Sequence, residues 1–414
     1  AQPCCPMHLS TTPLARPEPN SASIPPPQDA QALAQHNALR RLVRCLFAEG
    51  ILDSGSLVFA PHGITAWFPL WEHHALVYFS ALRAAPARTF LLDGTITLVE
   101  PSGKKTAIDT PDQLIDLLAP CFDFTATAQG LAGLKNDMAN SVANDALARG
   151  HRRHWNEELR QAILDTGSKG LVDYVRHHRT ARDAAVLLEQ WGSLEGHPFY
   201  PTWKTKPQLS PTEVAQLSPE FNACVPVRIA ALRADMAYVE RMPHVQDYRT
   251  WFSQQFPDVW QRWSDSLRAR QQNADDWLPL PIHTWHLEHY VKEAYADEIA
   301  EGVLITDGID IDTRPTMSFR TMVPQLPGAT PFIKLPLALW LTSEQRSLQA
   351  KSIHMGPRIS ALIQRILVAE NGFGHTLFVE QVIMVFGDQV ALLQHGGLQT
   401  AQAIHRLDFG GEDH

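Results

Sequence analysis

Cysteine is scarce in this 414-residue sequence. The five cysteines are Cys4, Cys5, Cys45, Cys121 and Cys224. This odd, sparse set gives no paired disulfide framework, and apart from the adjacent first two it lacks the close spacing of a metal site. Such usage in a large chain is typical of a reducing compartment, so we expect a cytoplasmic protein.

Long apolar runs and excess positive charge are also missing. No apolar run approaches the roughly 20 residues that span a bilayer, and the amino terminus lacks the basic region and apolar core of a secretory signal. Lysine and arginine number 35 against 44 aspartate and glutamate, a formal net charge of −9. We therefore expect neither a membrane nor nucleic acid as partner, and an anionic ligand would need a local cluster of basic side chains.

The common nucleotide and hydrolase motifs are absent too. The sequence contains no Gly-x-x-x-x-Gly-Lys-Ser/Thr phosphate loop, no Gly-x-Gly-x-x-Gly after a strand, no Gly-x-Ser-x-Gly elbow and no kinase-type His-Arg-Asp. If the protein binds a nucleotide, it does so on a less common scaffold.

Apolar residues make up 44% of the chain and charged residues 19%, which is typical of a globular protein large enough for more than one core. Residues 1–28 are proline-rich and predict a disordered or extended tail. The pattern over residues 29–190 predicts a mixed region: a helix over 29–49, an antiparallel sheet within 56–101 and helices over 111–191, with 132–148, 155–165 and 170–191 as separate runs.

Residues 191–414 predict a second, sheet-based region. We expect strands within 301–308, 316–323 and 332–342, one amphipathic helix over 248–270, and a helix that begins after Pro357. No internal repeat is present. The predicted fold class is α+β with several subdomains, a mixed helical amino-terminal half and a sheet-based carboxy-terminal half.

The loop "EGHPFYPTWKTK" at 195–206 carries the first candidate site residues. His197 can exchange a proton near neutral pH, and Lys204 with Lys206 supplies positive charge beside prolines that restrict the backbone. The alternative is a surface turn whose prolines and aromatic side chains pack locally. Composition alone favours that alternative.

The stretch "SFRT" is the second candidate. In a strand, Ser318 and Arg320 would share one face and Phe319 and Thr321 the other. A hydroxyl beside a guanidinium suits phosphate or carboxylate oxygens. An ordinary half-solvated strand is the alternative.

Two further cations lie close behind. Lys334 lies in the apolar run "FIKLPLALWLT", where an ammonium group needs a partner or a ligand unless it reaches solvent at an edge. Arg346 follows twelve residues later. His283, His286 and His289 are three residues apart, so a zinc site is a further alternative, although the His-Glu-x-x-His pattern is absent.

Taken in order, these stretches resemble the IucA/IucC family of siderophore synthetases, which work without a nonribosomal peptide synthetase. The resemblance covers roughly residues 190–370. It rests on the "GHPxxPxxKxK" loop, on "LPIHTW", on "SFRT", on "KLPL" with "TSxxR", and on "GPRIS". It implies a thumb, fingers and palm architecture, with 191–414 as the palm-like catalytic region, and a homodimer.

The resemblance also implies an activity. Family members use ATP and Mg²⁺ to adenylate a carboxylate of citrate or a citrate derivative, or 2-oxoglutarate, which an amine or hydroxyl nucleophile then captures. By resemblance, the nucleotide would be held by a set of hydroxyl and basic side chains: Ser318, Arg320, Thr321, Lys334 and Lys204. Arg346, with Arg320 and Thr321, would contact the substrate carboxylate, and His197 and Arg346 would be catalytic. No metal ligand is assigned.

Two departures from the family pattern accompany the resemblance. Tyr200 stands where the loop usually has a second histidine, and it will not titrate near pH 7. The family's later His-x-Gln-Asn stretch has no convincing counterpart between 371 and 414. We expect a fragmentary chain, with a split protein or a degenerate homologue as alternatives; the last would be a catalytically incomplete binding or scaffold subunit.

Overall fold

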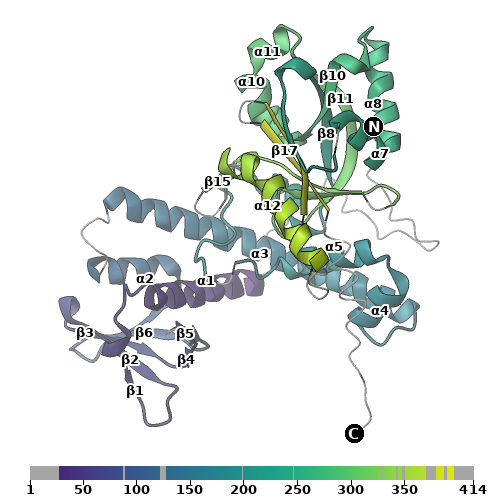
Figure 1. The fold of residues 1–414 in the computed structure, drawn as a ribbon. Coiled ribbons are helices and arrows are strands. Elements are labelled where there is room, and N and C mark those ends of the chain that lie inside the picture. The colour runs from purple at the N-terminus through teal and green to yellow at the C-terminus, as the bar shows by residue number, and fades with distance from the viewer. Residues whose placement is uncertain are drawn as a thin grey trace.

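The computed structural model describes residues 28–86, 89–121, 127–197, 199–245, 247–328, 330–341, 344–346, 350–369, 379–386 and 389–395. Among these residues it shows two large antiparallel sheets and two smaller two-stranded ones, with helices between and around the large sheets (Figure 1). The smaller of the two large sheets belongs to the amino-terminal part of the chain and the larger one to the carboxy-terminal part. The long helix α3 (Ala128–Asp165) runs between them. The predicted α+β class is confirmed.

The amino-terminal sheet has the strand order β1-β2-β3-β6-β7, beside a separate pair β4-β5. The strands of this sheet are β1 (Val58–Phe59), β2 (Ala66–Leu70), β3 (Ala75–Phe79), β6 (Ile96–Val99) and β7 (Lys105–Ile108), and the separate pair consists of β4 (Leu82–Ala85) and β5 (Thr89–Leu92). Helix α1 (Gln28–Ala48) packs against it, and the Phe47 ring lies 4.9–6.5 Å from those of Phe68, Phe79 and Phe90. The predicted helix and antiparallel sheet are confirmed here.

Helices follow where the sequence predicts them: α2 (Pro111–Leu118), α3, α4 (Leu171–His178) and α5 (Ala181–Gly192). The single helical run predicted over 170–191 is wrong, because Arg179 is extended (φ −130°, ψ 151°) and separates α4 from α5. Thr110 and Gln113 form a reciprocal capping box at the start of α2. The two predicted runs at 132–148 and 155–165 are one continuous helix, α3. Burial of Ala148 and Trp155 on either side of the connecting turn outweighs the roughly 1 kcal/mol cost of the intervening Gly150.

The carboxy-terminal sheet has eight strands in the order β10-β8-β11-β12-β13-β17-β16-β9, and all of its pairings are antiparallel. The strands are β8 (Val225–Arg233), β9 (Tyr238–Arg241), β10 (Trp277–His283), β11 (Leu304–Pro315), β12 (Thr321–Pro324), β13 (Phe332–Lys334), β16 (Val379–Phe386) and β17 (Gln389–His395). A two-stranded unit of β14 (Leu337–Leu341) and β15 (Glu344–Arg346) lies beside it.

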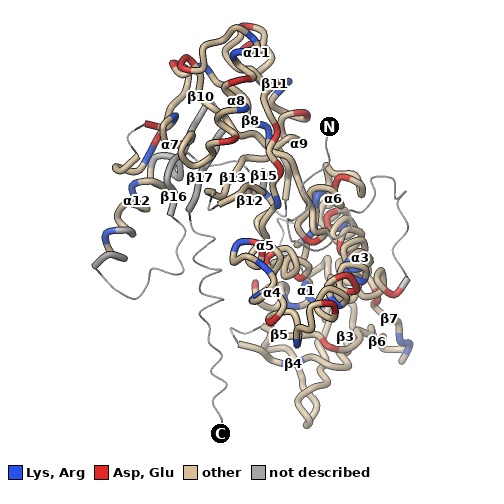
Figure 2. The backbone as a smooth tube through the Cα atoms, turned by 90° about the vertical axis from the view of Figure 1, so that its right-hand side faces the viewer, with Lys and Arg blue, Asp and Glu red and all other residues tan. Residues whose placement is uncertain are grey.

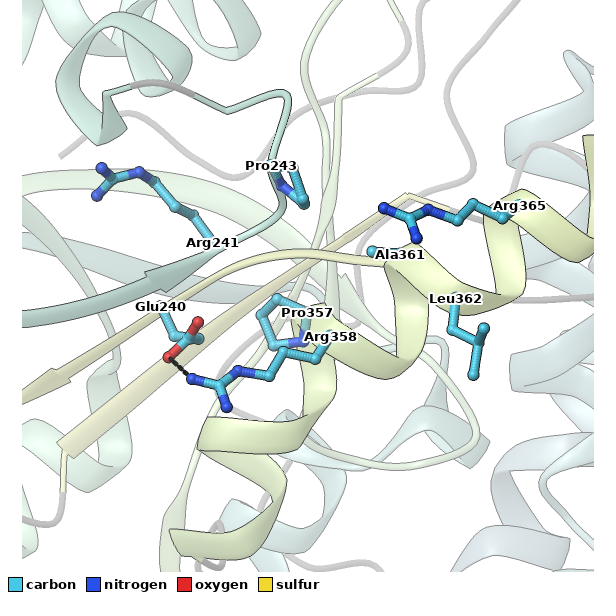
Figure 3. A pocket seen from close by; sticks show the side chains of 8 residues that line it. All are labelled: Glu240, Arg241, Pro243, Pro357, Arg358, Ala361, Leu362 and Arg365. Carbon is cyan, nitrogen blue, oxygen red and sulfur yellow. Dashed lines mark ion pairs between the residues drawn. The ribbon is translucent and has the colours of Figure 1, made fainter.

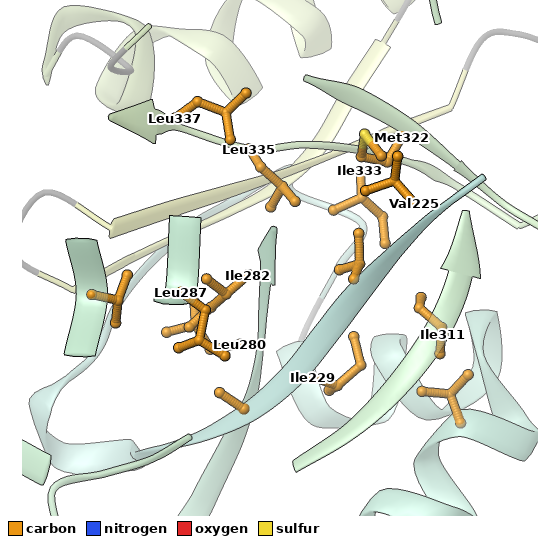
Figure 4. Close-up of a cluster of buried hydrophobic side chains, with 14 of the residues drawn as sticks. Val225, Ile229, Leu280, Ile282, Leu287, Ile311, Met322, Ile333, Leu335 and Leu337 are labelled. Carbon is orange, nitrogen blue, oxygen red and sulfur yellow. The ribbon is translucent and has the colours of Figure 1, made fainter. Parts of the chain in front are cut away.

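The largest apolar core forms on this sheet. Val225 and Ile229 of β8, Ile311 of β11 and Ile333 of β13 are almost fully buried together (Figure 4). Burial of each such side chain contributes about 1.5–3 kcal/mol. The pairing of β11 with β8 is interrupted between Ile305 and Ile309, and a methyl group at Gly308 would come within 1.8 Å of the Ile229 carbonyl oxygen. Only glycine fits this irregular crossing.

Helices α6 (Pro211–Leu217), α7 (Tyr248–Gln255), α8 (Pro257–Ala269), α9 (Thr284–His286), α10 (Lys292–Ala294) and α11 (Ala296–Ala300) surround this sheet. The single helix predicted over 248–270 is wrong, because α7 and α8 are separate. Phe256 leaves helical geometry (φ −135°, ψ 60°) immediately before Pro257. A proline restricts the preceding residue in this way and favours the first turn of a new helix.

Helix α12 (Ala350–Ala369) packs against β16 and β9. The prediction that it begins after Pro357 is wrong, because seven helical residues precede that proline. Pro357 lacks the N–H of a regular helical bond, but its ring is buried, and this packing keeps it inside the helix.

The division of the chain at 190/191 stays a prediction. Side chains pack across it in both directions: Trp203 belongs to the amino-terminal core, whereas Ala148 belongs to the carboxy-terminal one. The predicted tail, 1–28, lies outside the described residues except for its last residue, where α1 begins.

Candidate functional site

Residues 316–321 form a tight turn between β11 and β12, so the strand alternation predicted for Ser318 and Arg320 is wrong. Phe319 has a left-handed backbone (φ 67°), and its N–H donates to the Thr316 carbonyl at 3.0 Å. Thr316 N–H in turn donates to the Thr321 carbonyl at 2.8 Å. A buried aromatic ring in this backbone region is unusual and is held only by its surroundings.

The turn joins two hydroxyl groups. Ser318 Oγ donates to Thr321 Oγ1 at 2.6 Å and accepts from the Thr321 N–H at 3.0 Å. Thus Ser318 pairs with Thr321 and not with Arg320. An exposed hydroxyl (Ser318) and a buried one (Thr321) in fixed orientation are good partners for phosphate or carboxylate oxygens.

Arg320 and Arg346 lie together although 26 residues separate them. Arg320 Nη1 donates to the Arg346 carbonyl at 2.8 Å, and Arg346 Nη2 donates to the Leu341 carbonyl at 2.9 Å. Burial lowers the pKa of Arg320, and the nearby charge of Arg346 lowers it further. Two like charges held side by side are typical of a site for a polyanion.

Lys334 joins them from the neighbouring strand. It is paired with Thr321 in the antiparallel register of β12 and β13, and Leu335 N–H donates to the Arg320 carbonyl at 3.0 Å. Three short segments therefore bring five predicted residues close together: Ser318, Arg320, Thr321, Lys334 and Arg346. We call this group the hydroxyl–cation cluster.

Side chains of helix α5 form hydrogen bonds with the backbone at this turn. Glu189 accepts the Met317 N–H at 3.2 Å, and Gln190 donates to the Pro315 carbonyl at 3.0 Å. Farther along, the buried Arg182 donates to the Thr330 and Pro324 carbonyls at 2.6 and 3.2 Å. Sequence reasoning missed these residues, because a polar residue in an amphipathic helix does not reveal which strand it will meet.

The backbone of the loop at 195–206 forms hydrogen bonds with side chains of α1 and α3. Arg41 of α1 donates to the carbonyls of Glu195 and His197 and stacks over the Trp203 ring at 4.4 Å. Gly196 has φ 58°, and a methyl group there would meet Trp203 at 2.6 Å. On α3, Ser141, Asn144 and Asn140 bond the backbone of residues 204 and 206.

His197 lies on the exposed part of this loop. Its Nδ1 accepts N–H groups from Phe199 and Tyr200 at 3.3 and 3.2 Å, so the neutral ring carries its proton on Nε2. The ring meets that of Tyr200 edge-on at 4.7 Å. Local bonds therefore fix the orientation of His197 while leaving its Nε2 edge to other partners.

Lys204 and Lys206 point inward instead. Their ammonium groups lie 3.4 and 3.0 Å from the same carboxylate oxygen of Glu220, and all three side chains are less than a tenth exposed. Burial by itself would raise the pKa of Glu220, but the two ammonium charges and a backbone hydrogen bond hold it at about 2. Burial lowers the pKa of Lys204; the Glu220 carboxylate opposes this shift, and the neighbouring Lys206 charge adds to it. Glu220 carried no signal in the sequence.

The three spaced histidines do not converge. His283 is fully buried, and burial together with the His286 charge lowers its pKa to about 3. His286 Nδ1 accepts the Ala338 N–H at 3.0 Å, while His289 stacks on Trp285 and lies 3.7 Å from Glu213. Within the described ranges, no group of three His, Cys, Asp or Glu side chains is arranged to hold a metal ion.

Chemically, the hydroxyl–cation cluster can bind phosphate and carboxylate oxygens. Its two guanidinium groups, an ammonium group and two hydroxyls donate hydrogen bonds, which is the donor set a nucleotide triphosphate needs. The chain offers this local positive group despite its negative net charge. No helix among the described residues is long and apolar enough to cross a membrane.

Several known proteins are similar to this chain in sequence or in fold. The model of the IucA / IucC family matches residues 184–401. An uncharacterized protein of Sinorhizobium fredii, y4xN, is 51% identical over 82% of this chain and 54% of its own length. A D-ornithine–citrate ligase of Staphylococcus aureus is 28% identical over 63% of this chain and 37% of its own length.

Among solved structures, the ATP-bound aerobactin synthetase IucA of Klebsiella pneumoniae superposes with a TM-score of 0.65 and 17% identity, over 90% of this chain and 62% of that one. At this identity the match establishes a shared fold. The chain spans about half the length of the curated relatives it matches, or less.

Proposed function

Because the chain belongs to the IucA/IucC family, we propose that it is a ligase of siderophore biosynthesis that uses ATP to activate a carboxylate. The observation that carries the proposal is the hydroxyl–cation cluster, in which Arg320 and Arg346 lie side by side next to the Ser318–Thr321 hydroxyl pair. The names of two similar proteins are consistent with this proposal: one is a D-ornithine–citrate ligase and the other an ATP-bound aerobactin synthetase.

In the proposed reaction an oxygen of the substrate carboxylate attacks the α-phosphorus of ATP, and the bond to the β-phosphate breaks to release pyrophosphate. An amine or hydroxyl then attacks the acyl carbon, loses its proton, and displaces AMP. The acid would be citrate, a citrate derivative or 2-oxoglutarate. Both steps bring anions together, so orientation and charge neutralisation by fixed cations are the main contributions of the protein.

The residues take the following proposed roles. Ser318, Thr321, Arg320 and Lys334 hold the phosphates, and Arg346, with Arg320 and Thr321, orients the substrate carboxylate. His197 offers its Nε2 edge to the charge that develops at phosphorus. Lys204 adds positive charge from the buried side of the loop, since its ammonium group lies against Glu220 and does not face solvent.

Mg²⁺ enters the proposal together with the nucleotide, since it prefers phosphate oxygens and water. It would neutralise phosphate charge, and we assign it no ligand from this chain. The other proposed partners are the small-molecule acid and nucleophile, and a second copy in a homodimer, which sedimentation of the purified protein would detect.

The direct test is pyrophosphate release by this chain with ATP, Mg²⁺, citrate and a diamine, with mass spectrometry of the product. We expect release that depends on the acid, and Lys334→Met should weaken ATP binding. Lys105→Met is the matched control, because Lys105 is exposed on β7. Absence of acid-dependent release with citrate, a citryl monoamide and 2-oxoglutarate would exclude a ligase activity of this chain.

A binding or scaffold subunit is the second candidate. A subunit of this kind would bind ATP in calorimetry but release no pyrophosphate. Turnover by this chain alone would rule it out.

A further inference from the structure

Helix α12 exposes a row of large apolar side chains. Met355, Ile359, Leu362 and Ile366 are 48%, 46%, 57% and 50% exposed. Their spacing of four, three and four residues places them on one face of the helix. A continuous apolar row of this kind is normally covered by another part of a protein.

The helix that carries this apolar row is also basic. The 20 residues of α12 include Lys351, Arg358 and Arg365 but no Asp or Glu, although the whole chain has a net charge of −9. Figure 2 shows blue and no red positions along the coloured part of this helix. Arg358 and Arg365 are seven residues apart and so lie along one flank of the apolar row.

A cavity of about 320 Å³ adjoins the row where α12 meets the end of β9 (Figure 3). Leu362 lines this cavity and also belongs to the row. Among the described residues that line it, three are arginines, Arg241, Arg358 and Arg365, and one is a carboxylate, Glu240, which lies 3.8 Å from Arg358. The cavity therefore has an excess of guanidinium groups and suits an acidic side chain.

We propose that this face of α12, defined by Met355, Ile359, Leu362, Ile366 and the flanking arginines, is a docking surface for an acidic amphipathic helix. Its apolar side would cover the row, and an Asp or Glu beside that side would enter the arginine cavity. Because the surface is basic, charge complementarity requires a partner helix with acidic side chains. The spacing of the apolar residues on α12 matches the spacing by which an amphipathic helix packs into an apolar groove.

The source of that helix is the polypeptide by which longer relatives exceed the matched region. The solved synthetase aligns with 90% of this chain, yet 38% of its own length lies outside the match. The family match at 184–401 includes α12, so such relatives combine the counterpart of this helix with additional polypeptide. This inference concerns assembly and does not depend on the reaction proposed above.

Overlapping synthetic 20-residue peptides that tile the unmatched part of the y4xN relative provide the test, with binding to this chain measured by fluorescence anisotropy. We expect an acidic amphipathic peptide to bind the parent chain. Its affinity for Leu362→Asp and for an Arg358→Glu, Arg365→Glu double variant should be lower by about tenfold or more. Its affinity for the parent chain should also fall at high salt. Trp71→Asp, at an exposed apolar side chain elsewhere, is the matched control and should bind normally.

Three results would overturn the proposal: no peptide binds, the bound peptides are basic, or Leu362→Asp binds as well as the parent chain. A homodimer that Leu362→Asp dissociates would also overturn it, because the surface would then belong to a second copy. Circular dichroism of each variant checks that the fold is kept, which we expect because Leu362 is exposed.

Discussion

Lys206 Nζ lies 5.6 Å from the centre of the Phe319 ring and so links the loop at 195–206 to the turn that carries the hydroxyl–cation cluster. Phe319 presents its ring there because its backbone is left-handed. Lys206 reaches it while bonded to Glu220 at 3.0 Å. Two stretches that are distant in the sequence are thus joined through one cation.

This contact predicts energetic coupling between the loop and the turn. Lys206→Met and Phe319→Leu should each weaken ATP binding, and the double variant should lose less than the sum, with a coupling free energy of about 0.5–2 kcal/mol in calorimetric titrations. Phe319→Leu combined with Trp71→Ala is the control pair and should be additive. Additivity of the Lys206 and Phe319 changes would show that the two segments act independently.

Glu220→Gln should destabilise the protein strongly. The change leaves Lys204 and Lys206 buried beside a neutral amide, and loss of one partner from a buried ion pair costs about 3–5 kcal/mol. Urea unfolding followed by circular dichroism measures this. Glu157→Gln removes a solvent-exposed pair with Arg160 and should leave the midpoint unchanged. If both variants unfold at the same urea concentration, the buried trio contributes no stability.

His283 should make stability depend on pH. Its pKa is about 3 in the folded protein, against about 6.5 in an unfolded chain. Between these values the unfolded state binds more protons, so stability is lost as pH falls from about 6.5 towards 3, by about 3 kcal/mol at pH 4 from this residue alone.

His283→Asn should make that pH dependence shallower, because asparagine can still accept the Trp285 N–H at the start of α9 but does not titrate. Some dependence should persist, since burial also lowers the pKa of His151 to about 4. The exposed His73→Asn variant is the control. An unfolding free energy that falls equally steeply in parent and His283→Asn proteins between pH 7 and 4 would contradict the assignment.

Arg346→Ala should reduce ATP binding or acid-dependent pyrophosphate release by about ten- to a hundredfold, the value of one or two charge-assisted hydrogen bonds. Thermal unfolding should change little. Arg268→Ala, at an exposed position on α8, is the matched control. Undiminished ATP binding and turnover would mean that another arginine performs this role.

Local sequence patterns predicted the regular elements well where periodicity was clear. Helix α1 and the antiparallel sheet after it follow from a 3.6-residue repeat and from turn signals between β-branched runs. Two of the errors occurred at prolines: Pro257 divides a predicted helix, whereas Pro357 lies inside one. The difference is the burial of the ring against other strands, which no local pattern contains.

For the candidate site, the sequence identified residue types and their order but not their grouping. Arg320 and Arg346 are in contact because β12, β13 and the β14–β15 unit fold back on one another. The same folding placed Ser318 beside Thr321, against the predicted alternation, since the turn at Phe319 replaces a strand.

The sequence by itself determined the fold class, the family resemblance and the scarcity of positive charge that makes a local cluster necessary. Only the tertiary structure decided that Lys204 and Lys206 face Glu220 and that α12 presents an apolar row beside arginines. The physical reason is the range of the interactions. Propensity and periodicity act over a few residues, whereas ion pairing and burial depend on which distant segments meet.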